Sequence, residues 1–93
     1  MQVTRINEFQ AAEGKADELW AFLQSLIPYI SASAGCISCE VLRSEENPQL
    51  FVVLEKWASA ADHSASIAAY PKEKMLAVMP LFGAAPKGAY YHA

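Results

Sequence analysis

Two apolar, β-branched segments separated by a short polar stretch constrain this chain more than any other feature. Residues 35–41 and 50–57 have the composition of strands, and Pro48 lies in the polar turn between them. The second segment leads directly to Ser59 and Asp62, whose Ser-x-x-Asp spacing is typical of a helix N-terminus. The sequence therefore predicts a β-hairpin that runs straight into a helix.

The rest of the chain supplies further strands and helices around this hairpin. Apolar side chains recur at three-and-four spacing after residue 16, which indicates an amphipathic helix, and Pro28 should kink or tighten its last turn. In chain order, we expect strand 2–9, helix 16–30, strand 35–41, strand 50–57, helix 59–70, a helical stretch 71–82 and strand 88–92.

This order predicts a single α+β domain over residues 1–93, with the ferredoxin-like split βαβ pattern and helices on one face of an antiparallel sheet. The composition is 54% hydrophobic and 18% charged, more apolar than one small core can hide. The helix-free face of the sheet must also be covered. We therefore expect a homodimer that forms through that face.

Charge and hydropathy exclude several classes of partner. The net charge is -3, and the lysines and arginines are scattered singly, so no basic stripe is available to bind nucleic acid. No apolar run approaches the roughly 20 residues that span a bilayer. The N-terminus has no basic segment followed by an apolar run, so we expect no membrane association and a cytoplasmic protein.

The two cysteines, Cys36 and Cys39, lie three residues apart on a predicted strand. Side chains alternate between the faces of a strand, so we expect the two thiols on opposite sides of the sheet and not bonded to each other. Too few other ligands lie nearby for a zinc site. We interpret both cysteines as small buried hydrophobic residues.

Several short motifs, taken in order, resemble the antibiotic biosynthesis monooxygenase (ABM) family. They are Phe9 before Glu13-Gly14-Lys15, then Gly35-Cys36-Ile37-Ser38, then Arg43-Ser44 with Asn47-Pro48, and finally Glu55-Lys56-Trp57 with Ser59. The resemblance covers almost the whole chain. It implies ferredoxin-like subunits paired as a dimeric α/β barrel, with a pocket between helices and sheet in each subunit. Several family members oxidise quinols, anthrones or related phenols with oxygen and use no metal or flavin.

One position departs from the family pattern. Family members commonly carry a histidine nine residues after the tryptophan, and this chain has Ser66 there. His63 lies three residues earlier, about 4.5 Å back along the helix axis and on the same face as Ser66 and Tyr70. We expect His63 to serve the same pocket from one turn away.

A cofactor-free oxygenase must bind a phenol or enol, remove its proton and stabilise the anion. A histidine with an ordinary pKa near 6.5 suits the proton transfer, so His63 is the expected base. The expected substrate-binding residues, which supply donors and aromatic walls, are Arg5, Asn7, Trp57, Ser66, Tyr70 and Tyr91.

Each of these assignments has a plainer alternative. His63 is otherwise a surface or capping histidine, and Trp57 otherwise anchors the corner between strand and helix. Arg5 and Asn7 share one face of the first strand, where they either orient substrate or form hydrogen bonds at a dimer interface.

Two further pairs of strand side chains complete the set of candidates. Tyr90 and Tyr91 alternate faces on the last strand, so at most one of them lines the pocket. Glu40 and Glu55 are expected to be solvated or ion-paired, with no chemical role.

The sequence and the resemblance together predict a cofactor-independent monooxygenase that acts on a quinol, anthrone or related phenol with O2 and needs no metal. One alternative is a dimeric module that binds a small molecule, or is purely structural, without turnover, and Ser66 at the family's histidine position favours it. A second alternative is an isomerase or decarboxylase that uses the same base without oxygen.

Overall fold

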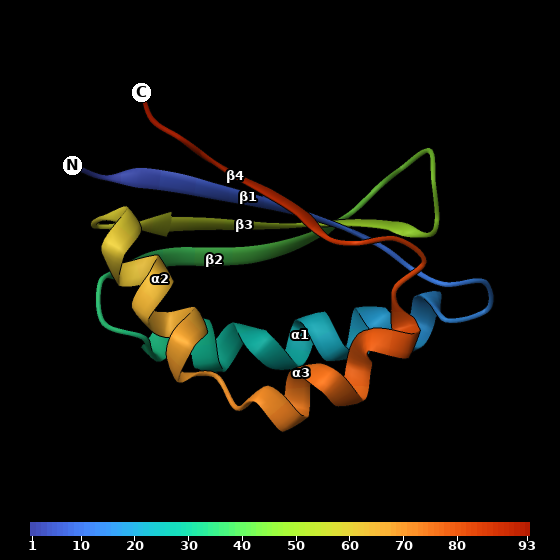
Figure 1. Ribbon diagram of the computed structural model, residues 1–93. Helices are drawn as coiled ribbons and strands as arrows, with labels where there is room; N and C mark the ends of the chain where they lie inside the picture. The colour runs from blue at the N-terminus through green and yellow to red at the C-terminus, as the bar shows by residue number, and fades with distance from the viewer.

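The computed structural model describes residues 1–93, and Figure 1 shows a layer of helices beneath one sheet. The elements are β1 (Val3–Gln10), α1 (Ala16–Ala32), β2 (Cys36–Arg43), β3 (Leu50–Trp57), α2 (Ala60–Ala69), α3 (Lys72–Val78), the 3-10 turn η1 (Met79–Leu81) and β4 (Lys87–Tyr91). Every predicted element is present, with ends that lie within two residues of the prediction.

The four strands form one antiparallel sheet in the order β2-β3-β1-β4. All the helices lie on the same side of this sheet, and both chain termini lie at the same end of it (Figure 1). This arrangement confirms the ferredoxin-like α+β fold. None of the helices is both long enough and apolar enough to cross a bilayer.

The turns follow the signals in the sequence. The Ser59 hydroxyl accepts a hydrogen bond from the Asp62 backbone N–H at 3.2 Å, so the predicted cap begins α2. Gly35 turns the chain from α1 into β2 with φ +85°, and the Asp62 side chain lies where a Cβ on Gly35 would be. Helix α1 continues through Pro28 and ends at Ala32.

Residues paired across the sheet share a face, and the pairs Arg5–Glu55, Asn7–Val53 and Phe9–Phe51 therefore define the face that the helices cover. Toward the Phe51 end this face carries the apolar core. The fully buried core side chains come from three segments and are Ala11, Leu19, Leu23, Phe51 and Val53.

The predicted placement of the cysteines on opposite faces is wrong. A bulge between Cys36 and Ser38 shifts the register, so Cys36 pairs with Trp57 and Cys39 pairs with Glu55. Trp57 and Glu55 belong to the helix-covered face, and both cysteines therefore do too. The thiols are free and half-buried, and burial raises the pKa of Cys39 to about 12, which makes this thiol unreactive.

The opposite face of the sheet, called the open face below, is not covered by any helix (Figure 1). Its apolar side chains are Ile6, Leu42, Val52, Leu54 and Tyr91, as the strand register requires. Leu42 is 46% exposed and Tyr91 is 54% exposed, whereas Ile6, Val52 and Leu54 are half-buried. An apolar strip of this kind is unusual on a surface that meets only water.

Candidate active site

A group of polar and aromatic side chains lies between α2 and the sheet, beyond the apolar core, with its inner members buried and its outer members partly exposed. We call it the polar cluster, and its members are Arg5, Asn7, Glu55, Trp57, His63 and Tyr90. It forms because the register pairs Arg5 of β1 with Glu55 on one side and with Tyr90 on the other. Helix α2 then places His63 above these strands.

Glu55 lies at the centre of the polar cluster and is only 4% exposed. Its Oε1 accepts a hydrogen bond from Trp57 Nε1 at 2.8 Å, and its Oε2 accepts one from Asn7 Nδ2 at 3.0 Å. Asn7 Oδ1 in turn accepts a hydrogen bond from Arg5 Nε at 2.9 Å. Burial raises the pKa of Glu55, while the two hydrogen bonds and the Arg5 charge act to lower it.

His63 is 3% exposed and lies between Glu55 and Tyr90. Its Nδ1 is 2.6 Å from the Tyr90 hydroxyl oxygen, and its Nε2 is 3.9 Å from Glu55 Oε1. Burial lowers the pKa of His63, and the Arg5 charge lowers it further. The resting imidazole is therefore neutral and able to accept a proton at neutral pH.

The outer part of the polar cluster consists of Tyr90 and Arg5. The Arg5 guanidinium carbon lies 4.7 Å from the centre of the Tyr90 ring, within the range of a cation–π contact. Tyr90 is 41% exposed, unlike the buried His63 and Glu55. Gly88 makes room for this arrangement, because a Cβ there would collide with Arg5 Nη2 and Asn7 Oδ1.

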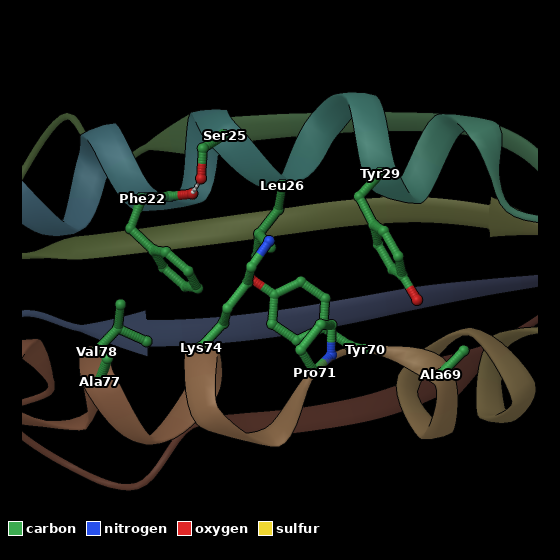
Figure 2. A pocket seen from close by; sticks show the side chains of 10 residues that line it. All are labelled: Phe22, Ser25, Leu26, Tyr29, Ala69, Tyr70, Pro71, Lys74, Ala77 and Val78. Atoms are coloured by element: carbon green, nitrogen blue, oxygen red, sulfur yellow. Dashed lines mark hydrogen bonds between the residues drawn. The ribbon is translucent and has the colours of Figure 1, made fainter.

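The largest cavity lies elsewhere, between α1 and the segment that joins α2 to α3 (Figure 2), with a volume of about 670 Å³. In Figure 2 the side chains of α1 and α3 face each other across the opening, and strands pass behind it. The lining residues are Phe22, Ser25, Leu26, Tyr29, Ala69, Tyr70, Pro71, Lys74, Ala77 and Val78. Lys74 is the only charged residue among them, and no member of the polar cluster belongs to the lining.

Comparison with known proteins decides the family. The sequence profile of the family described as "Antibiotic biosynthesis monooxygenase" matches residues 2–68, which is well over half of the chain. The chain belongs to the antibiotic biosynthesis monooxygenase family. No curated protein matches the sequence. Nowhere in the structure do three His, Cys, Asp or Glu side chains converge to hold a metal ion.

Solved structures support the fold assignment. Protein SO0527 from Shewanella oneidensis is 30% identical, and the match covers 99% of this chain and 90% of that one with a TM-score of 0.86. PA3566 from Pseudomonas aeruginosa is 22% identical, with coverage of 99% and 93% and a TM-score of 0.88. A variant of SnoaB, a cofactor-independent oxygenase from Streptomyces nogalater, is 17% identical, with coverage of 99% and 92% and a TM-score of 0.82.

Within this ABM-family fold, the structure brings four of the expected site residues together: Arg5, Asn7, Trp57 and His63 all belong to the polar cluster. Trp57 is 0% exposed and donates to Glu55, so its ring anchors the corner between β3 and α2 rather than forming an open wall. His63 is neither a surface nor a capping residue.

The other three expected residues lie outside the polar cluster. The Ser66 hydroxyl is 3.0 Å from the Ser33 hydroxyl, and the Ser66 carbonyl accepts a hydrogen bond from the Tyr29 hydroxyl at 2.8 Å. Tyr70 follows the end of α2, in an extended conformation, and lines the large cavity beside Tyr29. Tyr91 points to the open face, because side chains alternate along β4 and Tyr90 shares the face of Arg5. The expectation that Tyr91 lines the pocket is therefore wrong, and Tyr90 takes that position.

The sequence interpretation missed Glu55 and Tyr90. Glu55 was expected to be solvated or ion-paired, but it accepts two neutral N–H donors in the interior. Glu40 is paired with Leu54 and points to the open face, so it does not pair with Glu55. The one signal available was spacing: Glu55 lies two residues before Trp57 on one strand, and the two therefore share a face.

Proposed function

We propose that this ABM-family protein is a cofactor-independent monooxygenase that oxidises a quinol, an anthrone or a related phenolic small molecule with O2. The observation that carries the proposal is the neutral, 3% exposed His63, held between a phenol and a buried carboxylate. A base of this kind can remove the proton of a phenol or enol at neutral pH. The resulting anion is electron-rich enough to reduce oxygen.

The reaction needs no other reductant. When a methylene carbon of an anthrone becomes a carbonyl, one atom of O2 enters the substrate and the other leaves as water with the two displaced hydrogens. The protein has three tasks: to hold the substrate, to take its proton and to stabilise the oxyanion. Arg5 supplies a positive charge beside the base, and Asn7 holds the Arg5 side chain in place through a hydrogen bond of 2.9 Å.

We propose further that two subunits pair through the open face. The apolar side chains Leu42 and Tyr91, 46% and 54% exposed, support this pairing, because a second copy would remove them from water. Light scattering should give the mass of a dimer at micromolar concentration. Leu54→Lys should give a monomer, whereas Leu76→Lys, at a 65% exposed site on α3, should remain a dimer. A monomeric wild type would contradict the pairing.

The function is tested by oxygen uptake in the presence of a chelator, with a panel of quinols, anthrones and naphthols. We expect consumption that exceeds autoxidation in the wild type and falls to the background rate in His63→Gln. The same panel is assayed without oxygen, because an isomerase or decarboxylase would continue to turn over there. Uptake that stays at the autoxidation rate for every compound would contradict the oxygenase.

A second candidate is a binding module without turnover, and one observation favours it. The 670 Å³ cavity is lined mostly by aromatic and aliphatic side chains, with Lys74 as its only charge, and it has no contact with the polar cluster. Such a cavity suits a flat apolar molecule that carries a negative group. Calorimetric titration with naphthoates would detect this binding, and Ala77→Trp should abolish it while leaving oxygen uptake at the wild-type rate.

A further inference from the structure

His63 cannot meet a substrate directly, because its side chain is buried beneath α2 at 3% exposure. Glu55 behind it is 4% exposed. Of the side chains that contact the His63 ring, Trp57 and Glu55 are buried, whereas Tyr90 is 41% exposed and its hydroxyl oxygen lies 2.6 Å from Nδ1. The Tyr90 hydroxyl therefore offers a short path for a proton between this histidine and a bound molecule.

We propose that Tyr90 is the catalytic residue that contacts the substrate, and that His63 and Glu55 act behind it as a buried proton relay. This inference rests on the proposed function, since it names the group that performs the deprotonation. It assigns Tyr90 a role that neither the sequence nor the cavity indicated.

The hydrogen-bond network defines which proton moves. Glu55 accepts hydrogen bonds at both oxygens, from Trp57 Nε1 and Asn7 Nδ2, as a carboxylate does. We assign the hydrogen of the neutral His63 ring to Nε2, which faces Glu55 at 3.9 Å, so that Nδ1 accepts from Tyr90.

The transfer balances in atoms and charge. The Tyr90 hydroxyl proton moves to Nδ1 as the substrate O–H bond breaks and its proton bonds to the Tyr90 oxygen. The bonding electron pair stays on the substrate oxygen, which becomes an oxyanion, and His63 becomes an imidazolium. No oxidant takes part in this step.

Each charge that forms has an opposite charge beside it. The imidazolium faces the Glu55 carboxylate at 3.9 Å, and the oxyanion at Tyr90 meets the Arg5 guanidinium, which lies 4.7 Å from the ring centre. The other titratable side chains that β2 places on this face are Cys36 and Cys39, whose thiol pKa values are raised by burial, so they stay neutral, and Arg43, whose guanidinium carbon lies 4.2 Å from the Trp20 ring centre. Asp62 of α2 lies against Gly35 instead.

The test removes one oxygen atom from the site. Tyr90→Phe keeps the ring that Arg5 and His63 pack against, and we expect the kcat of oxygen uptake to fall on the order of 100-fold or more, while the protein stays folded with a lower urea midpoint because His63 Nδ1 loses its partner. Tyr91→Phe is the matched control, because it deletes the same atom from the next residue on the opposite face. Its uptake should equal that of the wild type.

A second variant replaces Tyr90 by 3-fluorotyrosine, whose phenol is more acidic. We expect uptake to recover and the basic limb of the pH–rate profile, where the phenol loses its proton to solvent, to move to lower pH. Recovery with an unchanged profile would mean that the hydroxyl only supports the structure, and wild-type uptake by Tyr90→Phe would overturn the relay directly.

If the wild type oxidises no compound in the panel, the proposed function fails but the relay is still testable. The 15N resonances of His63 should then show Nδ1 as a hydrogen-bond acceptor in the wild type and as unbonded in Tyr90→Phe. Identical Nδ1 resonances in the two proteins would overturn the relay without reference to any substrate.

Discussion

The two ends of the helix-covered face differ in chemistry although the same strand runs through both. At one end β3 presents Phe51 and Val53, 1% and 2% exposed, to the apolar core. At the other end it presents Glu55 and Trp57, 4% and 0% exposed, to the polar cluster. The β3 side chains are equally buried at both ends, so burial alone does not distinguish a structural core from a candidate site.

The energetics of the two ends differ as well. Each buried apolar side chain contributes about 1.5–3 kcal/mol through removal from water. A buried carboxylate costs several kcal/mol in lost hydration, which its hydrogen bonds and neighbouring charges largely offset. Every buried side-chain polar atom has a hydrogen-bond partner. The apolar end therefore contributes more to the free energy of folding than the polar cluster does. The polar cluster keeps its geometry because the surrounding strands and helix hold its side chains in place.

The largest expected effect is at the apolar end. Leu23 is 0% exposed, and Leu23→Ala should lower the free energy of unfolding by about 3–5 kcal/mol, because it leaves a cavity in the core. Urea denaturation measures the loss, with Leu76→Ala as the exposed control. The 15N resonances of His63 should stay unchanged below the transition. A change there would mean that the two ends are not independent.

Glu55→Gln should have a smaller effect on stability and a large one on the site. The glutamine amide places a donor against the N–H of either Trp57 or Asn7, which should cost about 1–3 kcal/mol. The matched control is Glu40→Gln on the open face. Equal urea midpoints for the two variants would show that the buried carboxylate forms no net favourable bonds.

The pH dependence of stability should reveal the buried histidine. Because burial lowers the pKa of His63 in the folded state, the unfolded chain binds a proton at higher pH than the folded one. The difference in unfolding free energy between the wild type and His63→Gln should therefore keep its full value above pH 6.5. The wild type should lose stability relative to the variant as the pH falls below 6.5. Urea denaturation between pH 5 and pH 8 tests this, and a flat difference would contradict the burial of His63.

The smallest effect is expected at the rim of the polar cluster. Gly88→Ala should displace the end of the Arg5 side chain from the Tyr90 ring, and the loss of stability should be about 1 kcal/mol because that side chain can move. Oxygen uptake should fall by more than the stability change implies if Arg5 stabilises the oxyanion, as we propose. Unchanged uptake would show that Arg5 takes no part in the reaction.

Local patterns in the sequence were sufficient for the secondary structure and the ferredoxin-like order. The Ser59 cap, the apolar spacing of α1 and the β-branched strands each depend on residues close together in the chain. Such patterns do not predict the bulge after Cys36. One extra residue in a strand reverses the face of the side chains before it, so the bulge moves Cys36 to the face of Cys39. The choice of Tyr91 over Tyr90 had another cause, because alternation places the two tyrosines on opposite faces without saying which face the helices cover.

The sequence by itself determined which elements form, their order and the presence of a histidine on α2 near the end of β3. Only the tertiary structure decided that Glu55 of β3 and Tyr90 of β4 meet His63. The contacts of the polar cluster join residues far apart in the chain: Tyr90 lies 27 residues after His63, and Asn7 lies 48 residues before Glu55. Contacts over such separations depend on strand register. A carboxylate becomes a buried hydrogen-bond acceptor, rather than a solvated charge, only once neighbouring strands and α2 have closed over it.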